Sequence, residues 1–184
     1  MARVEVGVFV GSLRKESINR KLAHALERLA GDRAAFRYIG IGDLPLYNQD
    51  FDADYPPRCK LLKDETSAAD AILFVTPEYN RSIPGVLKNA IDIASRPWGT
   101  NSFAGKPGAA IGTSAGAMST ALAQQHLRNV CVFINLHMMA QPEAFVRYKE
   151  GLFAEDGSVT DESVRGFLAN FVDSYLAWVQ RFSV

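Results

Sequence analysis

Short, wholly apolar runs alternate with segments of helical periodicity along this chain, and this pattern limits its fold more than any other feature. Strands that are apolar at every position are typical of a parallel sheet covered on both faces. Parallel strands need long crossovers between them, which the helical segments supply. The chain therefore predicts an α/β fold with five strands, at residues 4–10, 35–41, 71–76, 108–112 and 130–136.

Segments with apolar residues about one helical turn apart lie between and after these runs. They predict helices at residues 17–29, 57–68, 84–95, 119–129 and 161–182, whereas residues 44–50 are too rich in turn formers for regular structure. Residues 138–158 are less regular and fit either an additional strand or a surface excursion. Because 184 residues with 48% hydrophobic content suffice for one substantial core, we expect a single domain over residues 1–184.

The charge balance argues against whole classes of partner. Twenty basic residues match twenty acidic ones, so the chain lacks the basic excess of nucleic-acid-binding proteins. A net charge near zero is a weak indication of self-association. No apolar stretch approaches the roughly 20 residues of a membrane span, and the N-terminal sequence lacks a signal-peptide pattern. We expect a cytoplasmic protein with no nucleic-acid partner and no membrane insertion.

The cysteines and histidines form no recognisable catalytic or metal-binding motif. Cys131 lies in an apolar run, where a small buried hydrophobe is expected, and no disulfide framework is indicated. Cys59 lies near a predicted helix start, where a reactive thiol is the minor alternative. His24, His126 and His137 lie in or beside helix and strand patterns, which favours structural or exposed positions over catalytic ones.

The first predicted strand ends at a polar loop that leads into a helix. Backbone N–H groups at a helix N-terminus are unsatisfied, and the helix dipole favours an anion there. Ser12, Ser17 and Asn19 add neutral donors and Arg14 or Lys15 adds charge, which suits a terminal phosphate. Neither a Walker A ending nor a Gly-x-Gly-x-x-Gly fingerprint is present. Taken alone, the segment also fits an ordinary helix capped by Ser17.

Two further polar loops follow the third and fourth predicted strands. Free backbone amides and an aromatic ring after the third strand suit a planar heterocycle, and small side chains after the fourth permit close backbone approach. Each loop alone also fits an ordinary turn. Ligands of open α/β sheets bind outside the carboxyl ends of the strands, and in the order 2-1-3-4-5 strands one, three and four are neighbours. We therefore expect three loops to converge on one site, at residues 11–19, 76–82 and 113–117.

Five motifs occur in order between residues 4 and 142. They are GSLRKxSxN at 11–19, LPLYNQD at 44–50, TPEYN at 76–80, IPGVLKNAID at 83–92 and KP at 106–107. With these motifs the chain resembles the NADPH-dependent FMN reductase family, and in particular its bacterial chromate and quinone reductases. The resemblance implies a flavodoxin-like three-layer sandwich with a five-stranded parallel sheet in the order 2-1-3-4-5. It also implies non-covalently held FMN, with NADPH or NADH as the hydride donor.

The resemblance assigns roles to individual residues. The FMN phosphate would be held by Ser12, Arg14, Ser17 and Asn19. The isoalloxazine would be lined by Pro77, Glu78, Tyr79 and Asn80, with Ser114 and Gly116 beside it. Arg81 would lie near the mouth, where nicotinamide or acceptor stacks. The family forms dimers and this subgroup tetramers, which implies a homodimer or homotetramer with residues 47–50 near subunit contacts.

Together with the three loops, the resemblance implies an FMN-dependent NAD(P)H oxidoreductase that works by ping-pong hydride transfer. Its acceptors would be quinones and other small molecules, such as chromate, azo or nitro compounds, or free flavin. No general base is required, because the flavin carries the chemistry. One alternative is a flavodoxin-type electron carrier, although such carriers usually need a strongly charged docking face and this chain is neutral overall. The other is a binding module for a phosphate ligand, without redox activity.

Overall fold

The computed structural model describes residues 3–154 and 156–182. Its sheet has the strand order β2-β1-β3-β4-β5, and the strands pair in parallel. The predicted flavodoxin-like sandwich and its strand order are therefore confirmed. The strands are β1 (Val4–Val10), β2 (Ala34–Tyr38), β3 (Ala71–Val75), β4 (Pro107–Ser114) and β5 (His137–Met138), and β6 (Phe145–Arg147) pairs with β4.

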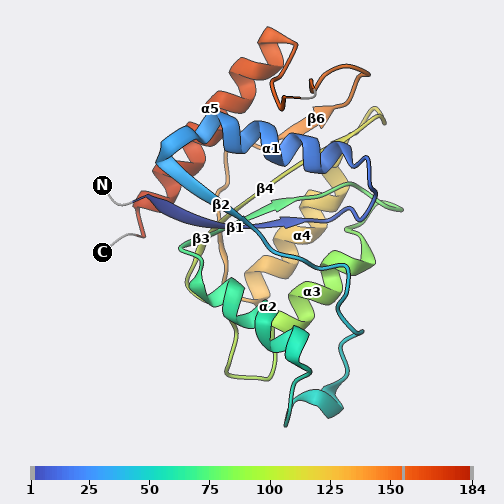
Figure 1. Ribbon diagram of the computed structural model, residues 1–184, viewed down its shortest axis with the longest axis vertical. Helices are drawn as coiled ribbons and strands as arrows, with labels where there is room; N and C mark the ends of the chain where they lie inside the picture. The colour runs from blue at the N-terminus through green and yellow to red at the C-terminus, as the bar shows by residue number, and fades with distance from the viewer. Residues whose placement is uncertain (1–2, 155, 183–184) are drawn as a thin grey trace.

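Helices cover both faces of the sheet (Figure 1). α1 (Ile18–Ala30) and α5 (Glu162–Gln180) lie on one face, and α2 (Pro57–Ala68), α3 (Gly85–Ser95) and α4 (Ala121–Phe133) lie on the other. Successive strand residues point to opposite faces, so each strand contributes to two separate apolar clusters. On the α2–α4 face, three fully buried rings pack with centroids 5.4 to 6.2 Å apart, namely Phe9, Phe74 and Phe103.

The helix boundaries follow from capping residues that the sequence shows. The side chain of Ser17 accepts a hydrogen bond from the N–H of Arg20 at the start of α1. Asp161 does the same for the N–H of Val164 at the start of α5. Side-chain acceptors at these positions satisfy N–H groups that a helix leaves free at its N-terminus. The loop at residues 44–50 is also present, with a short 3-10 turn at Gln49–Phe51.

Residues 130–136 do not form the predicted fifth strand. α4 continues through Phe133, and β5 follows it as the two-residue strand His137–Met138. A short apolar run fits a strand or a helix equally well, and here its burial is one-sided. Cys131 is fully buried, whereas Val132 and Phe133 are 80% and 66% exposed. A helix that covers one face of a sheet exposes its far side in this way, but a strand inside a covered sheet does not.

β5 and β6 share one edge of β4. β5 pairs with its amino end, and β6 pairs with its carboxyl end, where Thr113 aligns with Val146 and Ser114 with Arg147. The irregular region after residue 138 therefore contains an additional strand, one of the two possibilities that the sequence left open. β6 brings its last residue, Arg147, to the edge of the sheet at which the ligand loops were expected.

Candidate active site

The carboxyl ends of β1, β3 and β4 lie side by side, and the three predicted loops meet there. The N–H of Gly11 donates to the carbonyl of Val75 at 2.9 Å, and the N–H of Thr76 donates to the carbonyl of Ile111 at 3.0 Å. A Cβ atom added to Gly112 would lie 2.1 Å from the carbonyl oxygen of Thr76, so only glycine permits this approach. The convergence expected from the strand order is present.

The loop between β1 and α1 carries a run of free backbone donors. Within the described part of the chain, the N–H groups of residues 12–19 have no hydrogen-bond acceptor. Ser12 and Ser17 are 4% and 2% exposed, whereas Arg14 is exposed. Consecutive free N–H groups at a helix N-terminus form a site for an anion. Ser17 also caps α1 through its oxygen, and this leaves the hydroxyl proton available for donation.

Asn19 joins the first loop to the third. Its Oδ1 accepts from the N–H of Thr113 at 3.0 Å, and its Nδ2 donates to the carbonyl of Thr113 at 2.9 Å. The side chain is 1% exposed, so both bonds are shielded from water. Direct contact of Asn19 with a phosphate stays a prediction. The structure gives Asn19 a second role, which is to fix the start of α1 against the end of β4.

The loop after β3 is a tight hairpin. Tyr79 and Ser82 exchange two backbone hydrogen bonds of 2.9 and 3.0 Å, and the two residues between them, Asn80 and Arg81, have φ values of 52° and 64°. This is the geometry of a type I′ turn, which favours asparagine and glycine. An arginine in the left-handed region costs about 1–2 kcal/mol. The N–H groups of Glu78 and Asn80 have no acceptor within the described residues and are free to bond a ligand.

Two contacts fix this hairpin to α4. The carboxylate of Glu78 accepts from the N–H of Ala123 at 2.9 Å, where the positive end of the helix dipole favours a negative charge. The hydroxyl of Ser82 lies 2.7 Å from Nδ1 of His126, an exposed side chain of α4. The side chain of Glu78 is thus engaged by the protein, while its backbone N–H stays available. Tyr79 is 47% exposed beside it.

The loop after β4 consists mainly of small residues, and hydrogen bonds fix its conformation. The hydroxyl of Ser114 accepts from the N–H of Gly116 at 3.1 Å, and residues 115–118 are exposed. The carbonyl of Ser114 accepts from the N–H of Tyr148 at 2.9 Å, and the hydroxyl of Ser119 donates to the carbonyl of Val146 at 2.7 Å. These bonds tie the loop to β6 and leave its small residues facing outward.

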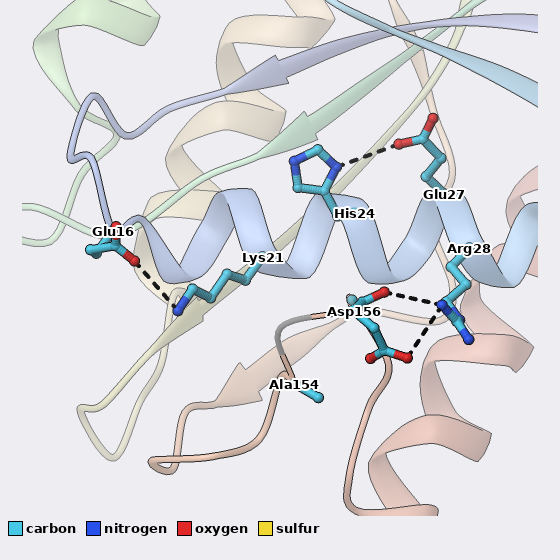
Figure 2. A pocket seen from close by; sticks show the side chains of 8 residues that line it. Glu16, Lys21, His24, Glu27, Arg28, Ala154 and Asp156 are labelled. Carbon is cyan, nitrogen blue, oxygen red and sulfur yellow. Dashed lines mark hydrogen bonds and ion pairs between the residues drawn. The ribbon is translucent and has the colours of Figure 1, made fainter.

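A cavity of about 580 Å³ is lined by Glu16, by residues of α1, and by Ala154, Asp156 and Gly157, and Figure 2 shows its lining. Its charged side chains contact one another, so it lacks the free donors found at residues 12–19. The contacts are Lys21 with Glu16 at 3.7 Å, His24 with Glu27 at 3.5 Å and Arg28 with the carboxylate of Asp156 at 3.5 Å. The converging loops, rather than this cavity, are therefore the candidate active site.

Neither cysteine contributes to the site. Cys59 is 2% exposed and Cys131 is fully buried. Burial raises the pKa of the Cys59 thiol, and it raises the pKa of Cys131 to about 12. The alternative of a reactive thiol at Cys59 is thus not supported. In the described ranges, no cluster of three His, Cys, Asp or Glu side chains suits a metal ion, and no helix could cross a membrane.

The chain as a whole matches a known protein family. The sequence model of the NADPH-dependent FMN reductases matches residues 4–151. A 2-hydroxy-1,4-benzoquinone reductase from a Burkholderia species is 50% identical over 177 residues, which cover 96% of this chain and 97% of the relative. A quinone reductase from Pseudomonas putida is 48% identical over 176 residues, or 95% of this chain and 94% of the relative.

A solved structure supports the same conclusion. The flavoenzyme NAD(P)H:(acceptor) oxidoreductase FerB from Paracoccus denitrificans aligns with a TM-score of 0.95 at 49% identity, over 98% of this chain and 100% of that one. Sequence and fold therefore agree over almost the whole chain. The protein belongs to the NADPH-dependent FMN reductase family.

Proposed function

We propose that this protein is an FMN-dependent NAD(P)H oxidoreductase that reduces quinones. The overall reaction is NAD(P)H + H⁺ + quinone → NAD(P)⁺ + hydroquinone, a transfer of two electrons. When bound, FMN supplies the hydride-transfer chemistry, and the protein supplies binding, orientation and electrostatics. The run of free N–H donors at residues 12–19, facing the hairpin and the small loop, is the observation that carries this proposal.

The first loop suits the phosphate end of FMN. The free N–H groups and the nearly buried hydroxyls of Ser12 and Ser17 would surround the phosphate, and the exposed guanidinium of Arg14 would neutralise part of its charge. Asn19 would act on this site through Thr113, because its bonds hold the loop at a fixed distance from β4. The donor set is thus matched to a phosphate monoester.

The second and third loops suit the isoalloxazine. The free N–H groups of Glu78 and Asn80 would bond the polar edge of the ring, and Tyr79 offers an aromatic surface beside it. Pro77 ends the strand sharply, and the small residues Ser114 and Gly116 leave room for the ring at the other side. The nicotinamide and then the acceptor would bind in turn against the ring face that these loops would leave uncovered.

Quinones are proposed first among the acceptors because relatives at 48% and 50% identity are named for them. An open ring face also suits chromate, azo and nitro compounds and free flavin. We further propose a homodimer or homotetramer. Trp98, Val132 and Phe133 are 78%, 80% and 66% exposed, and exposed apolar groups of this kind often mark contacts between proteins. Light scattering after gel filtration tests this, since a purely monomeric protein would contradict it.

Steady-state kinetics of the FMN-loaded protein test the function. Initial rates with NADPH and a quinone should give parallel lines in double-reciprocal plots, because each substrate reacts and leaves before the other binds. A flavodoxin-type carrier would be reduced slowly by NADPH and NADH but rapidly by a reductase. A phosphate-binding module would show no turnover at all. Either of these results would replace the proposal.

A further inference from the structure

Two arginines at the outer edge of the site have no ion-pair partner. Arg81 lies at the tip of the hairpin after β3, Arg147 is the last residue of β6, and both are exposed. Over the described residues, neither guanidinium makes a hydrogen bond or a salt bridge. Six other arginines are paired with carboxylates, namely Arg28, Arg33, Arg37, Arg58, Arg128 and Arg165.

Arg81 occupies a position that arginine does not favour. Its φ of 64° is the left-handed conformation, and the hairpin cannot relax freely because Glu78 and Ser82 fix it to α4. Strained residues of this kind tend to occur at functional sites. Within the described residues, the Arg81 side chain makes no hydrogen bond or ion pair, so its guanidinium is free to contact a bound molecule.

Arg147 lies on the other side of the third loop. It is in register with Ser114, and the bonds from Tyr148 to Ser114 and from Ser119 to Val146 hold β6 against this loop. Because β4 lies between β3 and β6 at this end, Arg81 and Arg147 flank the loop that would lie beside the ring. The two cations thus border the place where a substrate would meet the flavin.

Among the described contacts, no carboxylate pairs with Arg81 or Arg147, although the exposed Glu150 lies three residues after Arg147. The carboxylate of Glu78 is bound by the N–H of Ala123, and Glu16 pairs with Lys21 at 3.7 Å. The whole chain has twenty basic and twenty acidic residues. The two unpaired positive charges at this edge therefore reflect where the arginines lie and not the overall composition. A local positive potential at the rim of a site raises the concentration of anionic ligands there.

We propose that Arg81 and Arg147 bind the negative charge of the electron acceptor, so that the enzyme prefers anionic quinones to neutral ones. The inference rests on the proposed quinone reductase function. One anionic acceptor of this kind is a 2-hydroxyquinone, the class for which the Burkholderia relative is named, and it is a vinylogous carboxylic acid that is ionised at neutral pH. Its charge is shared by two oxygens, as in a carboxylate, and the planar donor fork of arginine matches this arrangement.

The test compares two quinones that share one ring system. The FMN-loaded enzyme is assayed at saturating NADPH with 2-hydroxy-1,4-naphthoquinone, which is an anion, and with neutral 1,4-naphthoquinone. The measured quantity is the ratio of kcat/KM for the anion to kcat/KM for the neutral quinone. The difference in redox potential between the two quinones is the same for every variant, so a change in the ratio reports recognition of charge.

Substitution of the two arginines should lower this ratio. Arg81→Gln and Arg147→Gln should each reduce it about three-fold, and the double variant about ten-fold, since an exposed ion pair has a modest effect. Arg147→Lys should retain most of the ratio because it keeps the charge. Arg3→Gln is the matched control: this exposed arginine directly precedes β1, at the opposite edge of the sheet, and its loss should leave the ratio unchanged.

Several results would overturn the inference. They are an unchanged ratio in the double variant, an equal fall in Arg3→Gln, and a ratio in the wild type that does not decline as salt screens the charges. A higher KM for NADPH with an unchanged quinone ratio would also overturn it, by assigning the arginines to the donor. Failure of the proposed function looks different, because the wild type would then turn over neither quinone.

Discussion

Replacing Ser17 by aspartate separates the two roles that this residue can have. Ser17 caps α1 by accepting from the N–H of Arg20 at 3.2 Å, and it also lies among the free N–H groups of residues 12–19. Aspartate is as good an N-cap as serine. Its carboxylate, however, cannot donate a hydrogen bond and repels a phosphate. Ser17→Asp should therefore keep the stability of the apo-protein and lose affinity for FMN.

The expected loss of FMN affinity in Ser17→Asp can be calculated from the burial of residue 17. Two unit charges about 5 Å apart, in an effective dielectric of about 20, repel each other by about 3 kcal/mol. Ser17 is 2% exposed, so salt screens this repulsion only weakly. Since about 1.4 kcal/mol is a factor of ten in Kd, the Kd for FMN should rise by about two orders of magnitude. Riboflavin has no phosphate, and its affinity should change little.

The assay titrates apo-protein with FMN or riboflavin and follows flavin fluorescence, with urea unfolding of the same samples as the stability control. Ser17→Ala is the second variant, and it should lose about 1 kcal/mol of stability because the cap is removed. An FMN Kd for Ser17→Asp close to the wild-type value would refute the phosphate assignment. An equal loss of riboflavin affinity would show that the substitution damages the fold instead.

Three other predictions concern the framework. Asn19→Ala removes both partners of the buried backbone of Thr113 and should lower the free energy of unfolding in urea by about 3 kcal/mol; a loss under about 1 kcal/mol would contradict the joining role. The hydroxyl of Tyr175 is buried without a partner among the described residues, so Tyr175→Phe should match the wild type or gain up to about 1 kcal/mol, and a clear loss in urea unfolding would disprove this. Burial raises the thiol pKa of Cys59 and Cys131, which keeps them protonated and unreactive, so a thiol reagent at about pH 8 should modify them only after denaturation. Rapid modification of the native protein would contradict the structure.

The fold could be predicted because its evidence is local. All five residues of β3 are apolar, and the structure buries all five. A strand of this composition predicts a covered parallel sheet without knowledge of its neighbours. The prediction of a fifth strand at residues 130–136 was wrong, because a short apolar run does not distinguish a strand from the last turn of a helix. The decisive fact, that Val132 and Phe133 face outward, depends on how α4 lies against the sheet.

The candidate site could be predicted as loops but not as contacts. The place of the loops follows from strand order alone, since consecutive parallel strands all end at one edge. The bonds that shape them join residues far apart, such as Asn19 and Thr113, separated by 94 positions, or Glu78 and Ala123, separated by 45. Nothing in the sequence near Asn19 indicates that its side chain bonds the backbone of β4.

Anaerobic reduction of the bound flavin tests whether the three converging loops form a flavin reductase site. The purified protein, loaded with FMN and freed of oxygen, is mixed with NADPH or NADH in a stopped-flow spectrometer, and a quinone is then added. The site described here predicts that the oxidised flavin absorbance bleaches with at least one of the two donors and returns when the quinone is reduced. Failure to bind FMN, or no bleaching with either donor, would contradict the assignment of the three converging loops to a flavin reductase.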